Sequence, residues 1–135
     1  MTAPEKASEI KGEKTTLYGY TVHIVKKVYL TVDEHGLHVR PVVYVVVAHP
    51  EDPKGYYMYK VEESDDPTYD WFIGLSVAEM YREIKDKVDA LYTKVREKIA
   101  AFDAIKGLLE KEGVIVRATC WGYYKDKEDV IKELQ

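Results

Sequence analysis

The most constraining feature of this sequence is a long run of apolar residues at helical spacing. Between positions 77 and 109 an apolar side chain recurs every three or four residues, which is the period of one face of an α-helix. Ser76 and Glu79 have the spacing of a capping box at the start of this run, and Gly113 marks its end. The pattern therefore predicts a helix over residues 76–112.

The length of this helix decides what else the fold needs. An unbroken helix over these positions spans about 54 Å at 1.5 Å per residue, whereas a ten-residue strand spans about 33 Å. Such a helix would project past any sheet it packs on, and its exposed apolar stripe would need a partner. We therefore predict a homo-oligomer joined through the long helix, unless the helix breaks near Gly107.

Four other segments have the composition of β-strands, namely 16–32, 37–48, 56–62 and 114–124. Short turns join the first three, which favours antiparallel pairing. Pro41 inside the second segment indicates an edge position or a bulge, because proline cannot donate to a ladder. With a short helix in residues 125–135, the order is β-β-β-α-β-α. This order predicts an α+β fold, a four-stranded antiparallel sheet with the long helix packed on one face.

The length of 135 residues suits a single domain. We expect this domain to cover residues 15–135, after a flexible tail over residues 1–14. The one cysteine, Cys120, excludes an internal disulfide, and a cytoplasmic location is expected. No segment has the length and apolarity of a membrane span or of a signal peptide, so no membrane partner is expected.

The polar composition is unusual. The chain contains no asparagine, and its only glutamine is Gln135, whereas lysine and glutamate are abundant. Depletion of the thermolabile amides together with enrichment in lysine and glutamate is typical of hyperthermophiles. We therefore expect an archaeal source, either a cell or a virus of one.

The strands separate into two faces when alternate residues are read. One set, which includes Val22, Ile24, Val43, Val45 and Val47, is apolar and is expected to lie under the helix. The opposite set is basic and aromatic and comprises His23, Lys27, Tyr29, His38, Arg40, Tyr44, Tyr56, Met58, Lys60, Arg117, Trp121 and Tyr123. The whole chain has a net charge of −4, so this face differs in charge from the rest of the molecule.

An exposed aromatic and basic face suits single-stranded nucleic acid, because unpaired bases stack on aromatic rings while cations contact phosphates. In this hypothesis Tyr29, Tyr44, Trp121 and Tyr123 stack bases, and Lys27, Arg40, Lys60 and Arg117 contact phosphates. The same residue types are also enriched where proteins meet. The alternative is therefore a structural or assembly subunit, of a cell or of an archaeal virus, whose aromatic face is a protein interface. A small-ligand pocket is a third reading.

This plan resembles the ThermoDBP-type single-stranded DNA-binding proteins of hyperthermophilic archaea. The resemblance covers about residues 15–124. It lies in the amide-poor composition, the long helix after Ser76 and the face through Lys27, Tyr29, Arg40, Tyr44, Arg117 and Trp121. It implies DNA rather than RNA as the ligand. This chain has its long helix in an internal position, where the family has a C-terminal leucine-zipper segment.

Other candidate chemistry is sparse. His35 and His38 could ligate a metal ion, but no second ligand pair accompanies them, so we assign neither a metal nor a cofactor. Cys120 lies on the apolar face and is assigned to the core. The sequence contains no glycine-rich phosphate loop, no nucleophile elbow and no zinc pattern. We therefore do not expect an enzyme, and catalysis would require a pocket converging on His23 or His38.

Overall fold

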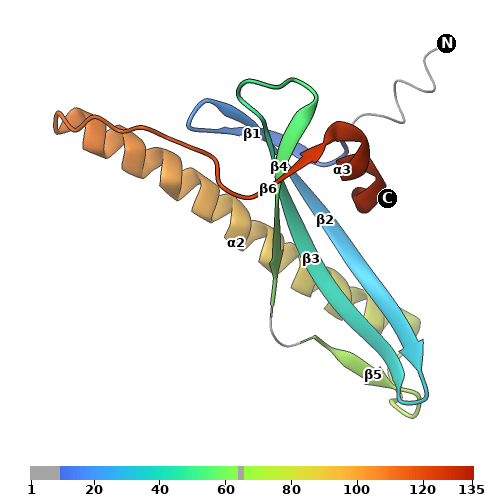
Figure 1. The fold of residues 1–135 in the computed structure, drawn as a ribbon. Helices are drawn as coiled ribbons and strands as arrows, with labels where there is room; N and C mark the ends of the chain where they lie inside the picture. Colours follow the sequence, from blue (N-terminus) through green and yellow to red (C-terminus); the bar gives the residue numbers. More distant parts are fainter. Residues whose placement is uncertain (1–9, 64–65) are drawn as a thin grey trace.

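The computed structural model describes residues 10–63 and 66–135, which form a twisted antiparallel sheet with helices on both faces (Figure 1). The strands in this part of the chain are β1 (Glu13–Leu17), β2 (Tyr20–Asp33), β3 (Gly36–Ala48), β4 (Gly55–Glu62), β5 (Thr68–Asp70) and β6 (Tyr123–Asp126). The helices are α2 (Val77–Lys111) and α3 (Lys127–Leu134). The sheet has the order β1-β2-β3-β4-β6, and β5 pairs with the end of β3 that β4 leaves free.

The predicted α+β class, the antiparallel sheet and the single long helix are confirmed. The prediction of four strands is wrong, because six strands lie in the described residues. The segment 16–32 divides into β1 and β2 at Tyr18 and Gly19, whose φ angles are 53° and 84°. Two successive left-handed residues form the tight turn that the twist of a hairpin favours. Strand β1 also begins at Glu13, inside the predicted tail, while residues 1–9 lie outside the described residues.

The prediction of a strand over residues 114–124 is also wrong, except for its last two residues, which belong to β6. Only the β6 residues pair with β4, opposite Gly55–Met58. Residues 114–122 instead run back beside α2 in an extended path (Figure 1). The helix ends far beyond the sheet, so the chain must use these residues to return before it can pair.

Helix α2 is continuous over 35 residues and passes through Gly107 without a break. The Ser76 hydroxyl accepts a hydrogen bond from the Glu79 amide at 3.2 Å, which confirms the predicted cap. Only its middle is buried, at Val88, Leu91, Val95 and Ile99. The C-terminal end extends well past the strands, whereas the N-terminal end lies beside the β2–β3 hairpin (Figure 1).

Each face of the sheet carries its own apolar cluster. Towards α2, the cluster contains Val22, Ile24, Val43, Val45 and Val47 with Leu91, Val95 and Ile99. On the opposite face it contains Val25, Val42, Tyr44, Val46 and Met58 with Val130 of α3. The separation of the two faces by alternation is thus confirmed. The second face is not open to solvent throughout, because α3 covers its centre.

Pro41 lies within β3, opposite Val28 of β2. The Val39 amide points away from β2 and donates to the Pro67 carbonyl at 2.9 Å. Backbone nitrogens two residues apart point to the same side of a strand, so the Pro41 nitrogen also points away from β2. It therefore lies where β3 changes its partner from β4 to β5. The expected edge position is wrong, because β3 is a central strand, but Pro41 sits in a gap of the ladder and interrupts no hydrogen bond.

Candidate functional site

The predicted nucleic-acid face is divided by α3. Tyr44 is only 1% exposed and Met58 is also buried, because Val130 and Leu134 of α3 pack over them. The Tyr44 hydroxyl lies 2.7 Å from that of Tyr29. The assignment of Tyr44 as a base-stacking residue is therefore wrong for this conformation, because no base can reach its ring while α3 is in place.

Lys27 is used within the fold. Its ammonium group donates to the backbone carbonyls of Glu133 at 2.5 Å and Gln135 at 3.3 Å, where α3 ends. A cation at the carboxyl end of a helix stabilises the unpaired carbonyls there. The same group lies 4.7 Å from the centre of the Tyr29 ring. Lys27 and Tyr29 thus hold α3 on the sheet rather than presenting a free cation and a free ring.

Two further cations of this face are close to carboxylates. Arg40 lies 3.6 Å from Asp66, and Lys60 lies 3.8 Å from Glu62. Exposed pairs of this kind contribute only about 0–1 kcal/mol, so they do not lock the side chains. They do neutralise the positive charge that the sequence pattern indicated. The face is of mixed charge, not basic.

His23, His38 and Tyr56 also have partners in the fold. His38 contacts Asp33 at 2.7 Å and the Thr68 hydroxyl at 3.1 Å, at the tip of the β2–β3 hairpin. His23 makes an edge contact with the Tyr56 ring at 6.4 Å between centroids. Burial, followed by the charges of two lysines, lowers the pKa of His23, so its ring is neutral at neutral pH.

Three predicted site residues remain free to meet a ligand. Trp121 is 86% exposed, Tyr123 is 81% exposed and Arg117 is exposed. Arg117 and Trp121 belong to the extended return segment, and only Tyr123 lies in a strand. The structure keeps these three residues as candidates for binding. Tyr123 lines a hollow together with Tyr44 and Lys60, whereas Arg117 and Trp121 are not among the residues that line it.

The exposed apolar stripe that was predicted for the long helix lies on the far half of α2, and the return segment beside it, which the sequence did not place there, adds further apolar side chains. We define this distal strip as Ile105, Leu108, Leu109, Val114 and Ile115, all of which are exposed. The Val114 amide donates to the Leu109 carbonyl at 3.0 Å, which fixes the return segment against the helix end. The signal in the sequence was the excess length of the helix over the strands.

The opposite end of α2 is also apolar and exposed. Trp71, Phe72, Val77 and Tyr81 lie at or just before the start of the helix. Trp71 donates its indole N–H to the Asp33 carbonyl at 3.0 Å, which places it beside the hairpin tip. Both ends of the helix thus present apolar side chains to solvent.

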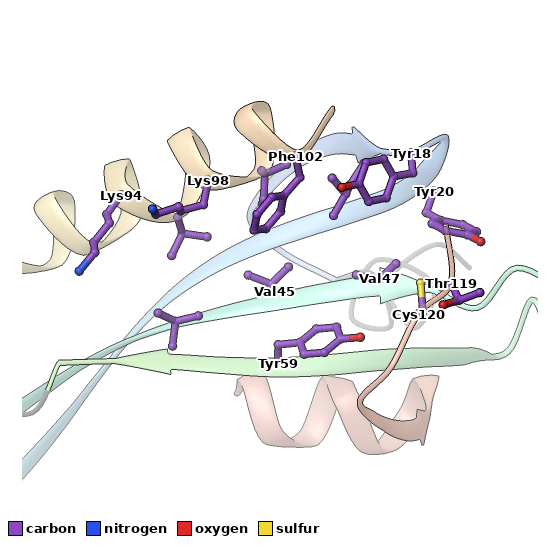
Figure 2. A pocket seen from close by; sticks show the side chains of 14 residues that line it. Tyr18, Tyr20, Val45, Val47, Tyr59, Lys94, Lys98, Phe102, Thr119 and Cys120 are labelled. Atoms are coloured by element: carbon purple, nitrogen blue, oxygen red, sulfur yellow. The ribbon is translucent and has the colours of Figure 1, made fainter. Parts of the chain in front are cut away.

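A second missed feature is a cavity of about 330 Å³ between α2 and the sheet. Its lining includes Leu17, Tyr18, Tyr20, Val45, Val47, Tyr59, Val61, Lys94, Val95, Lys98, Ile99, Phe102, Thr119 and Cys120. Figure 2 shows Phe102 reaching from α2 towards the sheet, with Tyr59 on the strand opposite. Cys120 is half-buried in this lining, and burial raises the pKa of its thiol.

The walls of this cavity are held by contacts between distant parts of the chain. The Tyr20 hydroxyl donates to the Ala118 carbonyl at 3.0 Å and so fixes the return segment. The Tyr18 amide donates to a carboxylate oxygen of Asp103 at 2.7 Å and so fixes the β1–β2 turn to α2. These two hydrogen bonds hold in place the return segment and the β1–β2 turn, which form part of the cavity wall.

Within residues 10–63 and 66–135, no group of three or more His, Cys, Asp or Glu side chains is arranged to hold a metal ion. No helix in the same residues is long and apolar enough to cross a membrane. Comparison of the chain with protein-family models, with curated proteins and with solved structures found no match.

Proposed function

We propose that this chain is an assembly subunit that joins copies of itself through the distal strip. One observation carries the proposal: α2 extends beyond the sheet, and its apolar repeat continues as Ile105, Leu108 and Leu109 in solvent. Soluble monomers rarely expose large contiguous apolar patches, and those that exist mark interaction surfaces. Burying such side chains stabilises an interface by about 25 cal/mol per Å² of apolar area.

The neighbouring return segment strengthens this proposal. Ile115 is 96% exposed although it is a large aliphatic residue, and Val114 beside it is half-exposed. The return segment thus adds exposed aliphatic side chains next to the end of the helix, where Val114 is bonded to the Leu109 carbonyl. A second copy of the same surface is the simplest occupant, because symmetric association buries both copies at once.

Light scattering on the purified full chain tests the proposal. The wild type should have the mass of an oligomer, and Ile105→Glu should reduce that mass because a charge would be buried at the interface. Ala90→Glu is the matched control, since Ala90 is exposed on the same helix and lies about 22 Å along it from Ile105. A monomeric wild type, or equal masses for both variants, would contradict the proposal.

Single-stranded nucleic-acid binding is the second candidate function. The specific observation in its favour is the exposure of Trp121 and Tyr123, two aromatic rings close together in the chain, with Arg117 exposed nearby in sequence. Exposed rings of this kind can stack bases at about 1–3 kcal/mol each. DNA is the preferred ligand of this hypothesis, and Tyr44 and Lys27 have no part in it.

Tryptophan fluorescence during titration with oligo(dT), at two salt concentrations, tests this second function. Binding should quench the emission, Trp121→Ala should weaken binding at both salt concentrations, and Arg117→Ala should flatten the salt dependence. Duplex DNA is the control and should give no quenching. None of these substitutions lies in the distal strip, so a result against one proposed function leaves the other untouched.

A further inference from the structure

The cavity between α2 and the sheet has the size of a ligand site. Its volume of about 330 Å³ lies at the lower end of the range of about 300–1,000 Å³ found for small-molecule pockets. The cavity is partly open to solvent, so a small molecule can enter it without unfolding of α2 or of the sheet.

The interior of the cavity is apolar and therefore favours the apolar part of a ligand. Valines of β3 and Val61 of β4 form its floor, and Val95, Ile99 and Phe102 of α2 face them. The hydroxyl of Tyr20 is already donated to a backbone carbonyl. A strongly polar ligand would lose its hydration here without gaining enough partners.

Two lysines, Lys94 and Lys98, are the charged side chains among the described residues that line the cavity, and the carboxylate of Glu63 lies beside Lys94. The two lysines lie four apart on the same side of α2. Figure 2 shows both on the helix, towards the end of the cavity opposite Cys120. Lys94 lies 3.6 Å from Glu63, but both side chains of this pair are more than half exposed, so water can replace the contact.

We infer that this cavity binds an amphipathic organic anion, with its apolar body between α2 and the sheet and its anionic group beside Lys94 and Lys98. The two lysine ammonium groups at the mouth favour an anionic head group over a neutral or cationic one. The inference goes beyond the assembly proposed above and stands apart from it, because no residue of the distal strip lines the cavity.

Octanoate is the probe, and octylammonium and octanol are matched controls with the same apolar chain and a different head group. The first readout is the rate at which a thiol reagent modifies Cys120, which lines the cavity and is the only cysteine. The second is the thermal unfolding midpoint, which a ligand of the folded state raises. Octanoate at ten times its dissociation constant should slow the modification about tenfold, and octylammonium should not.

Two variants assign the site. The double variant Lys94→Ser, Lys98→Ser changes only exposed side chains, and it should weaken octanoate about two- to tenfold while leaving octanol unchanged. Val47→Phe should fill the cavity and abolish the effect of octanoate on the midpoint. Fluorescence and light scattering on the same samples report whether each variant retains the fold and the assembly.

Four results would overturn the inference. They are no effect of octanoate on Cys120, an equal effect of octylammonium, octanoate affinity that both variants leave unchanged, and a midpoint that octanoate lowers. Protection of Cys120 that grows with protein concentration alone would assign the cavity to a second copy of the chain, and this too would overturn it.

Discussion

The hydroxyl oxygens of Tyr29 and Tyr44 lie 2.7 Å apart on the sheet face that α3 covers. The rings that were expected to be open to a ligand thus contact each other within the fold. Tyr44 is almost fully buried, whereas Tyr29 is only partly covered. Burial, reinforced by the hydrogen bond with Tyr29, raises the pKa of Tyr44. Tyr44 is therefore a neutral core residue whose polar atom has one specific partner.

The two tyrosines should respond differently to loss of their hydroxyls. Tyr29→Phe leaves the buried Tyr44 hydroxyl without its partner, which should cost about 1–3 kcal/mol of unfolding free energy. Tyr44→Phe leaves the Tyr29 hydroxyl, which can reach water, and should cost only about 0.5–1.5 kcal/mol. Urea denaturation of both variants measures the difference. Equal costs, or a larger cost for Tyr44→Phe, would contradict this account of the pair.

Val130 should be the residue that attaches α3 to the sheet. Its side chain is fully buried among Val42, Val46 and Met58. Val130→Ala should cost about 1–3 kcal/mol through lost burial and a residual cavity. Val130→Asp should detach the helix, open the aromatic face and increase binding of a hydrophobic dye. Asp129→Ala, at the adjacent exposed position, is the control. It should cost only about 0.3–1 kcal/mol through loss of a first-turn carboxylate and should not increase dye binding.

The tip of the β2–β3 hairpin should be sensitive to acid. The contact with His38, followed by the hydrogen bond from the His35 amide, lowers the pKa of Asp33 below its ordinary value. A depressed carboxyl pKa in the folded state gives stability that is present above the unfolded pKa of about 3.9 and is lost as the pH falls through the folded value. Asp33→Asn removes this contribution.

Thermal midpoints measured from pH 2 to pH 6 should therefore fall less steeply in Asp33→Asn than in the wild type. His38→Ala should show a similar but smaller flattening, because the backbone amides of His35 and Gly36 still donate to the carboxylate. A wild-type profile in both variants would mean that this carboxylate does not couple to folding.

Gly107, inside α2, and Gly113, just after its end, allow a direct comparison of the same substitution in two backbone conformations. Gly107 lies inside the helix, whereas Gly113 has a φ of 83°, and an added methyl group would meet nothing within 4 Å at either position. Gly107→Ala should stabilise the chain by about 0.5–1 kcal/mol, because alanine favours the helix and restricts the unfolded state. Gly113→Ala should destabilise it, because a left-handed conformation strains an L-residue.

Chemical denaturation of these two variants gives the comparison directly. The same sign of effect for both would show that local conformation is not what distinguishes the two glycines. Loss of oligomer mass in Gly107→Ala would point instead to a close approach of another chain at this exposed position.

Much of the fold could be predicted because its patterns are local. The apolar spacing and the capping box of Ser76 and Glu79 placed α2 to within one residue at each end. Alternation in the strands assigned Val43 and Tyr44 to opposite faces, as observed. The turn at Tyr18 was missed because a tyrosine rarely adopts a positive φ, so composition did not mark the division of β1 from β2.

The candidate site was predicted less well, because the sequence pattern did not show that α3 covers the second face of the sheet. The second face also contains Val25, Val42 and Val46, and these apolar residues need cover as much as those under α2. The C-terminal helix, with Val130 and Leu134 on one side, supplies that cover. An alternating pattern shows which residues share a face, but it does not show which distant segment will lie on that face.

The sequence by itself determined the long helix, the antiparallel strands and the separation of the two faces, because hydrophobic periodicity acts over a few residues. Only the tertiary structure decided which face is open. Lys27 meets the end of α3 across 106 positions of sequence, and Tyr20 meets Ala118 across 98. Contacts at such separations depend on how far α2 extends beyond the sheet and on where the returning chain can pair. The contact of Lys27 helps α3 to cover the predicted aromatic face. The contact of Tyr20 fixes the return segment, while the distal strip and the cavity beneath α2 stay open.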